Sequence, residues 1–228
     1  AYSYSVNTTA GFSIVKYTGN GSSGQQIPHH LGAVPHLIFL KPLDASDHWR
    51  VYHHQLHSSA PEEYFLRLQT TGTTGDSNDI WSDTAPTSSV FTVGNNSGVN
   101  ANDQNFIAYV FTEKTGYSKF GTYKGNGQSD GTFIYTGHKP EWIMIKRTDS
   151  ADWWGVFDSK RNGYNGANYH DRINEQSYAE TIKEIDILSN GFKMRTTDTA
   201  INASGGNYIY MSFGQSLVGS NNVPCTAR

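Results

Sequence analysis

The chain has 228 residues and a net charge of −3, and charged residues occupy only 16% of its positions. A chain of this length can bury a full hydrophobic core without help from a metal or a disulfide. Its charge balance lacks the basic footprint of a nucleic-acid-binding protein. No apolar run approaches the ~20 residues that a membrane span needs. We therefore expect neither a nucleic-acid partner nor insertion into a membrane.

The composition favours strands joined by tight turns. Aromatic residues make up 13% of the chain, and there are 23 glycines but only 7 prolines. Strands are rich in aromatic residues, and glycine supplies the backbone conformations that tight turns need. Because residue 1 is Ala, we expect a processed product or a segment of a longer protein. Residues 1–10 are expected to form a linker or an edge strand.

The sequence repeats itself. Residues 27–53 align without gaps on residues 132–158, an offset of 105 positions. Further matches extend this alignment upstream (11–21 with 116–127) and downstream (105–111 with 207–213). Such a duplication decides the architecture before any local propensity does. Since no linker is visible, we expect two copies, 11–115 and 116–216, packed around one interior as a single domain, with a tail at 217–228.

Each copy contains the same series of predicted strands. The first ends in Gly-Asn-Gly at 19–21, which predicts a hairpin-type turn because these residues tolerate positive φ. Short apolar runs then recur in both copies, at 36–41 and 141–146, at 49–53 and 154–158, and at 106–111 and 208–213. Residues 60–68 and 175–187 are predicted as either helical turns or strands. The pattern predicts an all-β, β-sandwich-like structure built from two pseudo-symmetric internal repeats.

A repeated motif, Lys-x2-Asp-x2-Asp-x-Trp, begins at Lys41 and again at Lys146. Carboxylates can bind pairs of hydroxyl groups, and an indole ring can pack on the face of a sugar. The alternative is structural, with the aspartates forming turns and the tryptophans filling the core. The motifs and their aromatic neighbours supply the candidate ligand-binding residues, which are Asp47, Trp49, His53, Trp81, Asp152, Trp153 and Trp154.

Seven of the nine histidines lie within residues 29–57. His53 and His54 would point to opposite faces of a strand, so at most a subset of the histidines could share a metal. With no His-Glu-x-x-His motif and no cysteine partner, no metal ligands are predicted. The Asp- and Asn-rich loops at 72–83 and 94–105 leave Ca²⁺ as a possible cofactor, although turn chemistry also accounts for their composition. No other cofactor is expected.

No catalytic motif is present. The chain has no Gly-x-Ser-x-Gly, phosphate-binding loop or dinucleotide fingerprint. Pairs of carboxylates that could act as acid and base are not distinguished from ordinary loop charges. The sequence therefore predicts a protein that is not an enzyme.

Several segments carry a family resemblance. "GFSIVKYTGNG", "HWRVYH", "GYSKFGTYKGNG" and "INASGGNYIYMSF" resemble a duplicated domain of virion structural proteins from marine tailed phages, often near the end of tail-fibre or appendage chains. The resemblance implies display outside the cell on a virion, contact with the host surface, association with other virion proteins and a homotrimer. It implies no role for any individual residue.

Three functions are compatible with these features. The first is a host-attachment module that binds a cell-surface glycan or another receptor. The second is a structural or decoration protein of the virion without a ligand, and the third is a glycan depolymerase. Two similar sites suit binding better than catalysis, which needs an asymmetric pair of carboxylates in one cleft. Because the first copy differs by its histidines and by Trp81, a single receptor site is expected there.

Overall fold

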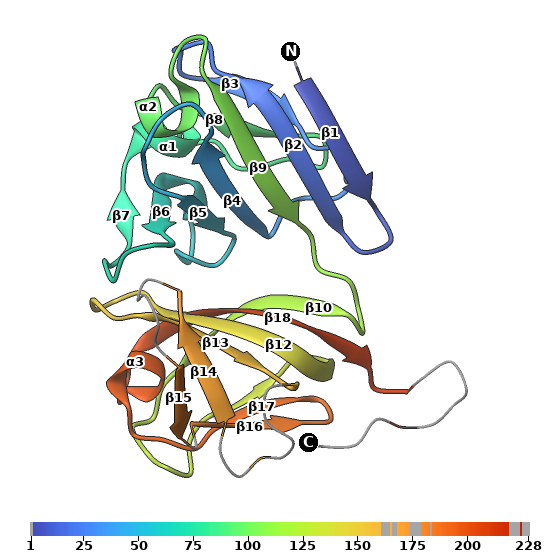
Figure 1. Ribbon diagram of the computed structural model, residues 1–228, viewed down its shortest axis with the longest axis vertical. Helices are drawn as coiled ribbons and strands as arrows, with labels where there is room; N and C mark the ends of the chain where they lie inside the picture. Colours follow the sequence, from blue (N-terminus) through green and yellow to red (C-terminus); the bar gives the residue numbers. More distant parts are fainter. Residues whose placement is uncertain are drawn as a thin grey trace. The chain divides into compact units, whose positions relative to one another are not determined.

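The computed structural model describes residues 2–160, 165, 168–173, 179–182, 184–218 and 224. The chain divides into two compact units (Figure 1). Unit 1 comprises Ala1–Gln69 and Thr74–Glu113, and unit 2 comprises Thr70–Thr73 and Lys114–Arg228. Each unit has its own cluster of buried apolar residues. The expectation of one interior shared by both copies stays a prediction, since other buried apolar residues, such as Leu37 and Met144, belong to neither cluster.

Unit 1 is built on a seven-stranded antiparallel sheet. Its order is β1 (Tyr2–Asn7), β2 (Phe12–Thr18), β9 (Asn105–Phe111), β4 (Leu37–Pro42), β5 (Arg50–His53), β6 (Tyr64–Arg67) and β7 (Gly75–Asp76). The remaining elements are a second sheet of β3 (Gln25–Pro28) and β8 (Val90–Val93), the 3₁₀ turn η1 (Pro61–Glu63), and the short helices α1 (Asn78–Trp81) and α2 (Ser97–Asn100). The strand β1 forms one edge of the larger sheet, as the edge-strand alternative for residues 1–10 supposes.

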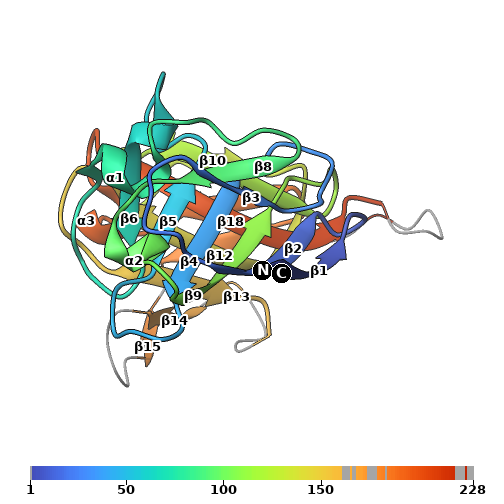
Figure 2. The ribbon, with the colours of Figure 1, turned by 90° about the horizontal axis from the view of Figure 1, so that it is seen from above.

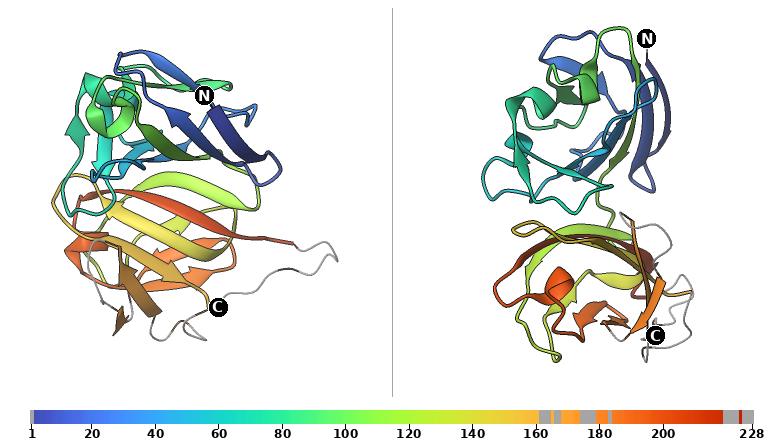
Figure 3. Two further views of the ribbon diagram at one scale, coloured as in Figure 1. Left: turned by 45° about the horizontal axis from the view of Figure 1, so that its top comes forward. Right: turned by 60° about the vertical axis from the view of Figure 1, so that its left-hand side comes forward.

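Unit 2 repeats this plan. Its six-stranded sheet has the order β10 (Ser118–Lys124), β18 (Asn207–Ser216), β12 (His138–Arg147), β13 (Trp154–Asp158), β14 (Asn168–Arg172) and β15 (Ala179–Ile182). A second sheet contains β11 (Phe133–Tyr135), β17 (Gly191–Met194) and β16 (Ile185–Leu188), and the described residues of this unit also form the short helix α3 (Thr199–Asn202). Figure 3 shows this second sheet across one face of the larger one.

The two large sheets share one strand order. The series β2-β9-β4-β5-β6 in unit 1 corresponds to β10-β18-β12-β13-β14 in unit 2. The all-β, sandwich-like fold with two internal repeats is thereby confirmed. The segment at 60–68 contains one 3₁₀ turn followed by a strand, and the described part of 175–187 is mainly strand. Among the described residues, no helix has the length and apolar character needed to cross a lipid bilayer.

The core of unit 1 follows from alternation along its strands. In β2, Val15 and Tyr17 are buried, whereas Lys16 between them is exposed. The buried face of the larger sheet packs against the smaller sheet of β3 and β8 (Figure 2). The smaller sheet contributes Ile27 and Phe91 to this core. The hydroxyl of Tyr17 donates to the carbonyl of Val99 at α2, and Tyr123 makes the equivalent bond to Ile201 at α3. Because successive side chains of a strand point to opposite faces, each of these strands buries one face in the core of its own unit.

The Gly-Asn-Gly segment corrects one prediction. It forms no hairpin turn, because β2 pairs with β1 and β9 while β3 pairs with β8. The segment instead carries the chain from the larger sheet to the smaller one. Gly21 has a φ of 70°, as the motif predicts, but Gly19 serves a different need. A Cβ there would lie 2.3 Å from the carbonyl oxygen of Ala101, and a Cβ at Gly125 would meet that of Ala203 at the same distance.

A buried asparagine fixes each of these loops. The side-chain amide of Asn100 donates to Asn20 Oδ1 (3.2 Å) and to the carbonyls of Ser22 and Gly94 (both 2.8 Å). Its oxygen accepts the backbone N–H of Asn20 at 2.8 Å. Buried polar groups are costly unless hydrogen-bonded, so this amide holds three chain segments together from within.

Unit 2 contains the same network around Asn202. The amide of Asn202 donates to Asn126 Oδ1 (3.2 Å) and to the carbonyls of Gln128 (2.8 Å) and Thr196 (2.7 Å), and its oxygen accepts the N–H of Asn126 at 3.0 Å. Both asparagines are fully buried. The repeat is therefore preserved in hydrogen-bond detail as well as in strand order.

Candidate functional site

The repeated Lys/Asp motif has a structural role in both units. Asp44 Oδ2 accepts the backbone N–H of Asn105 at 2.7 Å, and Asp149 Oδ2 accepts that of Asn207 at 2.9 Å. Each aspartate thus ties the turn after one strand to the first residue of its neighbour. The hydrogen bonds from Asn105 lower the pKa of Asp44. These contacts support the structural alternative for the first aspartate of the motif.

Four of the seven candidate ligand residues are buried. They are His53, Trp81, Trp153 and Trp154. Trp81 is only 2% exposed, and its indole N–H donates to the carbonyl of Tyr64 at 3.1 Å. His53 Nδ1 accepts the backbone N–H of Gln55 at 3.1 Å. All four side chains are therefore almost completely shielded from solvent, and Trp81 and Trp153 belong to the apolar clusters of their units.

The other three candidates are half-buried. Asp47 lies 3.5 Å from the guanidinium of Arg50, and Asp152 accepts the backbone N–H of Trp153 at 3.0 Å. Burial raises the pKa of Asp152. The ring of Trp49 lies 6.0 Å from that of Tyr109. Asp47 and Trp49 belong to unit 1 and Asp152 to unit 2.

Lys146 is the motif residue with the most unusual environment. Its side chain is fully buried, and Nζ donates to the carbonyls of Asp152 (3.0 Å) and Thr71 (3.2 Å). Thr71 lies in the short segment that clusters with unit 2. Burial lowers the pKa of Lys146 from 10.5 to about 8, although the carboxylate of Asp152 opposes this shift. Burial of an ammonium group disfavours its charged form.

The Lys146 shift predicts a pH dependence of stability. Because its pKa falls on folding, the unfolded chain binds more protons between about pH 8 and 10.5, and stability rises with pH across that window. The gain between about pH 7.5 and about pH 9.5 is expected to be roughly 1–2 kcal/mol. Urea unfolding at both pH values measures it. Lys146→Met should remove the rise, and an equal rise in this variant would refute the assignment.

The edge strand β1 of unit 1 presents an exposed surface that was not predicted from the sequence. All six residues of β1 are exposed, including Tyr2 (47%) and Tyr4 (53%). Tyr2 pairs with Tyr17, and Tyr4 with Val15, so both tyrosines continue the core-facing side of the sheet. The ring of Tyr4 stacks on that of His30, with 3.8 Å between centroids and an interplanar angle of 25°.

Two glutamines complete this surface, which we call the tyrosine strip: Tyr2, Tyr4, Gln25, Gln26 and His30. The hydroxyl of Tyr2 lies 3.3 Å from the carbonyl oxygen of Gln26 and 3.5 Å from the amide nitrogen of Gln25. The strip thus combines aromatic faces with hydroxyl, amide and imidazole groups. The signal for it was the alternation Tyr-Ser-Tyr-Ser, which places both tyrosines on one face of a strand.

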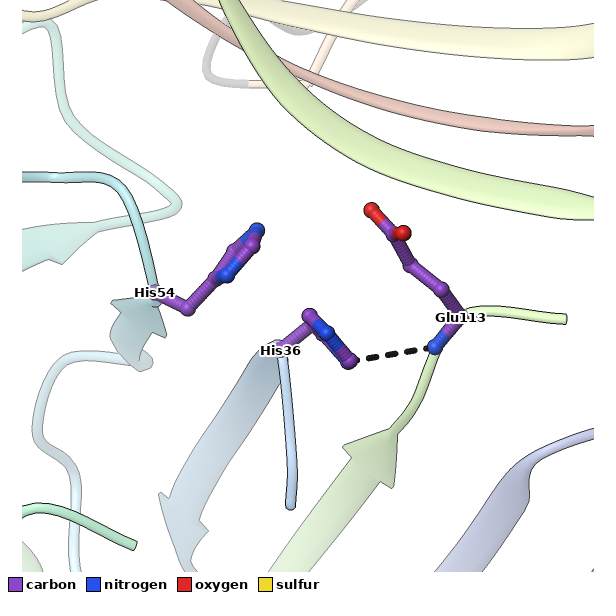
Figure 4. Close-up of side chains that lie close together, drawn as sticks. All are labelled: His36, His54 and Glu113. Atoms are coloured by element: carbon purple, nitrogen blue, oxygen red, sulfur yellow. Dashed lines mark hydrogen bonds between the residues drawn. The ribbon is translucent and has the colours of Figure 1, made fainter. Parts of the chain in front are cut away.

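A third feature lies at one end of the large sheet of unit 1. His36, His54 and Glu113, which we call the histidine–glutamate group, offer ligand atoms that all lie within 4.8 Å of one another. Figure 4 shows His54 and Glu113 reaching toward each other from either side of His36. The two imidazole rings are 4.5 Å apart between centroids and nearly perpendicular, at 81°. The sequence drew attention to His53 and His54, and the structure places only His54 in this group.

Comparison with known proteins gives one family. A family model described as a domain of unknown function (DUF7483) matches residues 2–216. No curated protein and no solved structure matches the chain.

Proposed function

We propose that this chain, which belongs to the family described as a domain of unknown function (DUF7483), is a host-attachment module of a phage virion that binds surface glycans through the tyrosine strip. The single observation that carries the glycan proposal is the exposed pair Tyr2 and Tyr4 beside His30. The virion setting, the homotrimer and the contact with other virion proteins rest on the resemblance of the sequence motifs described above.

The exposure of these tyrosines supports a binding role. An edge strand with unpaired backbone groups tends to associate with other chains, and proteins usually protect it with charges, bulges or a covering element. The strand β1 reads Tyr-Ser-Tyr-Ser-Val-Asn and has no charged residue. Exposed apolar patches rimmed by polar groups are typical of interaction sites. A surface of this kind is more easily explained by a ligand than by solvent exposure alone.

The chemistry of the strip favours a glycan. Aromatic rings pack against the apolar faces of sugars, and Tyr supplies a polar end as well. Residues two positions apart on a strand lie roughly 7 Å apart, so the two rings can contact a short oligosaccharide. Gln25, Gln26 and His30 offer hydrogen-bonding groups at the same place. Weak single sites suffice, because display of several copies raises avidity by ~10²–10⁴ when they engage together.

Binding is favoured over cleavage at this surface. Glycoside hydrolysis generally requires a pair of carboxyl groups on either side of the scissile bond. The five residues of the tyrosine strip include none. A depolymerase would need its acid and base elsewhere, whereas the strip itself is sufficient for recognition.

Substitution of Tyr4 tests this proposal. Tyr4→Ala is expected to weaken glycan binding by the full chain about tenfold, because it removes the ring that stacks on His30. Tyr4→Phe should retain most binding. The matched control is Tyr135→Ala, since Tyr135 is 60% exposed on β11 of unit 2. Glycan-array and host-cell binding assays measure the effect.

Two results would count against the proposal. Equal loss of binding in Tyr4→Ala and Tyr135→Ala would deny the strip a specific role. Absence of any glycan or cell binding by the unsubstituted chain, together with tight association with virus particles, would favour the structural or decoration role instead.

A further inference from the structure

We propose that the histidine–glutamate group of unit 1 is a binding site for a divalent transition-metal ion of the zinc type. His36, His54 and Glu113 would supply the three protein ligands. The site is separate from the tyrosine strip and does not depend on glycan binding.

Sheet topology brings the three residues together. The strand β4 runs antiparallel to both β5 and β9, which flank it. His36 immediately precedes β4, His54 immediately follows β5, and Glu113 lies two residues beyond β9. Because the start of one strand meets the ends of its antiparallel neighbours, all three reach the same end of the sheet. Backbone hydrogen bonds hold these strand ends side by side. The N–H of His54 donates to the carbonyl of His36 at 2.9 Å, and the N–H of His36 donates to the carbonyl of Phe111 at 2.8 Å.

The donor set selects the class of ion. Two imidazoles and one carboxylate suit Zn²⁺ and other late first-row divalent ions. Ca²⁺ prefers a larger shell made only of oxygen atoms. Zinc bonds of about 2.0–2.2 Å place tetrahedral ligand atoms roughly 3.4 Å apart. The present separations of up to 4.8 Å would therefore close by an inward movement of half-buried side chains at strand ends.

A neighbouring hydroxyl group can orient His36. His36 Nδ1 lies 3.2 Å from Thr112 Oγ1, and this hydroxyl donates its own proton to the carbonyl of Val34 at 3.1 Å. Thr112 Oγ1 can therefore accept a proton from Nδ1, which leaves the Nε2 lone pair for a metal. The alternative tautomer accepts the Glu113 N–H at Nδ1, 3.2 Å away (Figure 4). A metal at Nε2 selects the first tautomer and makes Thr112 a positioning residue.

Unit 2 provides an internal comparison. The corresponding end of its large sheet has the same backbone hydrogen bond. The N–H of Ser159 donates to the carbonyl of Glu141 at 2.8 Å, as the N–H of His54 does to the carbonyl of His36. Glu141, Ser159 and Gln215 stand where unit 1 has His36, His54 and Glu113. Gln215 donates its amide to Glu141, whose carboxylate also lies 3.7 Å from Lys160 Nζ. At these equivalent positions only unit 1 carries imidazoles, so the described residues predict one such ion for each chain.

An ion held by three protein ligands keeps at least one coordination position for water or a ligand oxygen. It would also join the ends of three neighbouring strands. Because such an ion binds the folded chain preferentially, it should raise the stability of unit 1 by mass action.

Metal binding by the full chain tests the proposal. Equilibrium dialysis of the chelator-treated protein against Zn²⁺ is expected to give one tightly bound ion per chain, and Co²⁺ should give the visible absorption of a four-coordinate site. His54→Ala and Glu113→Gln should each weaken binding at least tenfold. His57→Ala is the control, since His57 lies outside the group and stacks on Tyr64. Thr112→Val should weaken binding by about tenfold, and Thr112→Ser should restore it.

Circular dichroism of each variant verifies that the fold persists. If His36→Ala fails to fold, His54→Ala and Glu113→Gln still decide the matter. No stoichiometric binding of Zn²⁺ or Co²⁺, or binding that both variants leave unchanged, would overturn the proposal.

Discussion

Replacement of Asn100 by Ala is expected to destabilise unit 1 by about 3 kcal/mol. The substitution removes one buried amide and with it four hydrogen bonds. The carbonyl of the buried Gly94 loses its bond to this amide, and an unsatisfied buried acceptor costs about 1–3 kcal/mol. Asn202→Ala should do the same to unit 2. Hydrogen exchange measured separately for core amides of each unit shows which one opens.

Two further variants separate hydrogen bonding from packing. Asn100→Asp preserves the shape of the side chain but replaces its NH2 group by an oxygen that faces the carbonyl oxygens of Ser22 and Gly94. It should therefore lower the stability of unit 1 at least as much as Asn100→Ala. Asn102→Ala is the control, because Asn102 is exposed, and it should stay within about 0.5 kcal/mol of the parent. If Asn100→Asp were tolerated, the loops would depend on packing and not on this network.

Replacement of Trp81 by Ala is expected to cost about 3–5 kcal/mol of stability. The indole is almost completely buried in the core of unit 1 and meets the ring of Tyr52 edge-on, 5.9 Å away. Its removal leaves a cavity and the carbonyl of Tyr64 without the indole N–H bond. Denaturant unfolding measures the loss. Trp81→Phe should cost much less, because it retains most of the packing.

Trp49→Ala gives the contrast within the same unit. Trp49 is half-buried, and its ring lies against Tyr109. The expected cost is about 1–2 kcal/mol. An equal loss for Trp49→Ala and Trp81→Ala would show that exposure does not rank the two residues. Loss of glycan binding in Trp49→Ala with retained stability would return Trp49 to the set of ligand contacts.

Sequence comparison was sufficient for the architecture because the duplication is visible in it. The alignment of residues 27–53 with 132–158 predicted equivalent strands, and both sheets have the corresponding order. What it could not reveal is which strands share a core. Apolar patterns show that a residue is buried but not against which partner, and only the structure places Val15 with Ile27 in one cluster and Tyr123 with Ile134 in another.

The Gly-Asn-Gly segments show a similar limit. Positive φ at Gly21 follows from the residue type. The need for glycine at Gly19 arises from the carbonyl of Ala101, some eighty residues away in sequence. Close approach of distant backbone leaves no mark in a local pattern.

The candidate sites were harder to predict for the same physical reason. Conspicuous tryptophans attracted attention because large aromatic side chains serve both packing and recognition. Trp81 and Trp153 pack in the core clusters. The histidine–glutamate group depends on the pairing of three strands, and His36 and Glu113 are 77 residues apart. Only the sheet register places them at one end.

Hydrogen–deuterium exchange of the full chain with and without a glycan that it binds tests recognition by the tyrosine strip most directly. We expect slower exchange at residues 2–7 and 25–30 of unit 1 and no change at β11 of unit 2, where exposed aromatic side chains also occur. Protection confined to unit 2, or a bound glycan that leaves residues 2–7 unprotected, would contradict the assignment of recognition to the tyrosine strip.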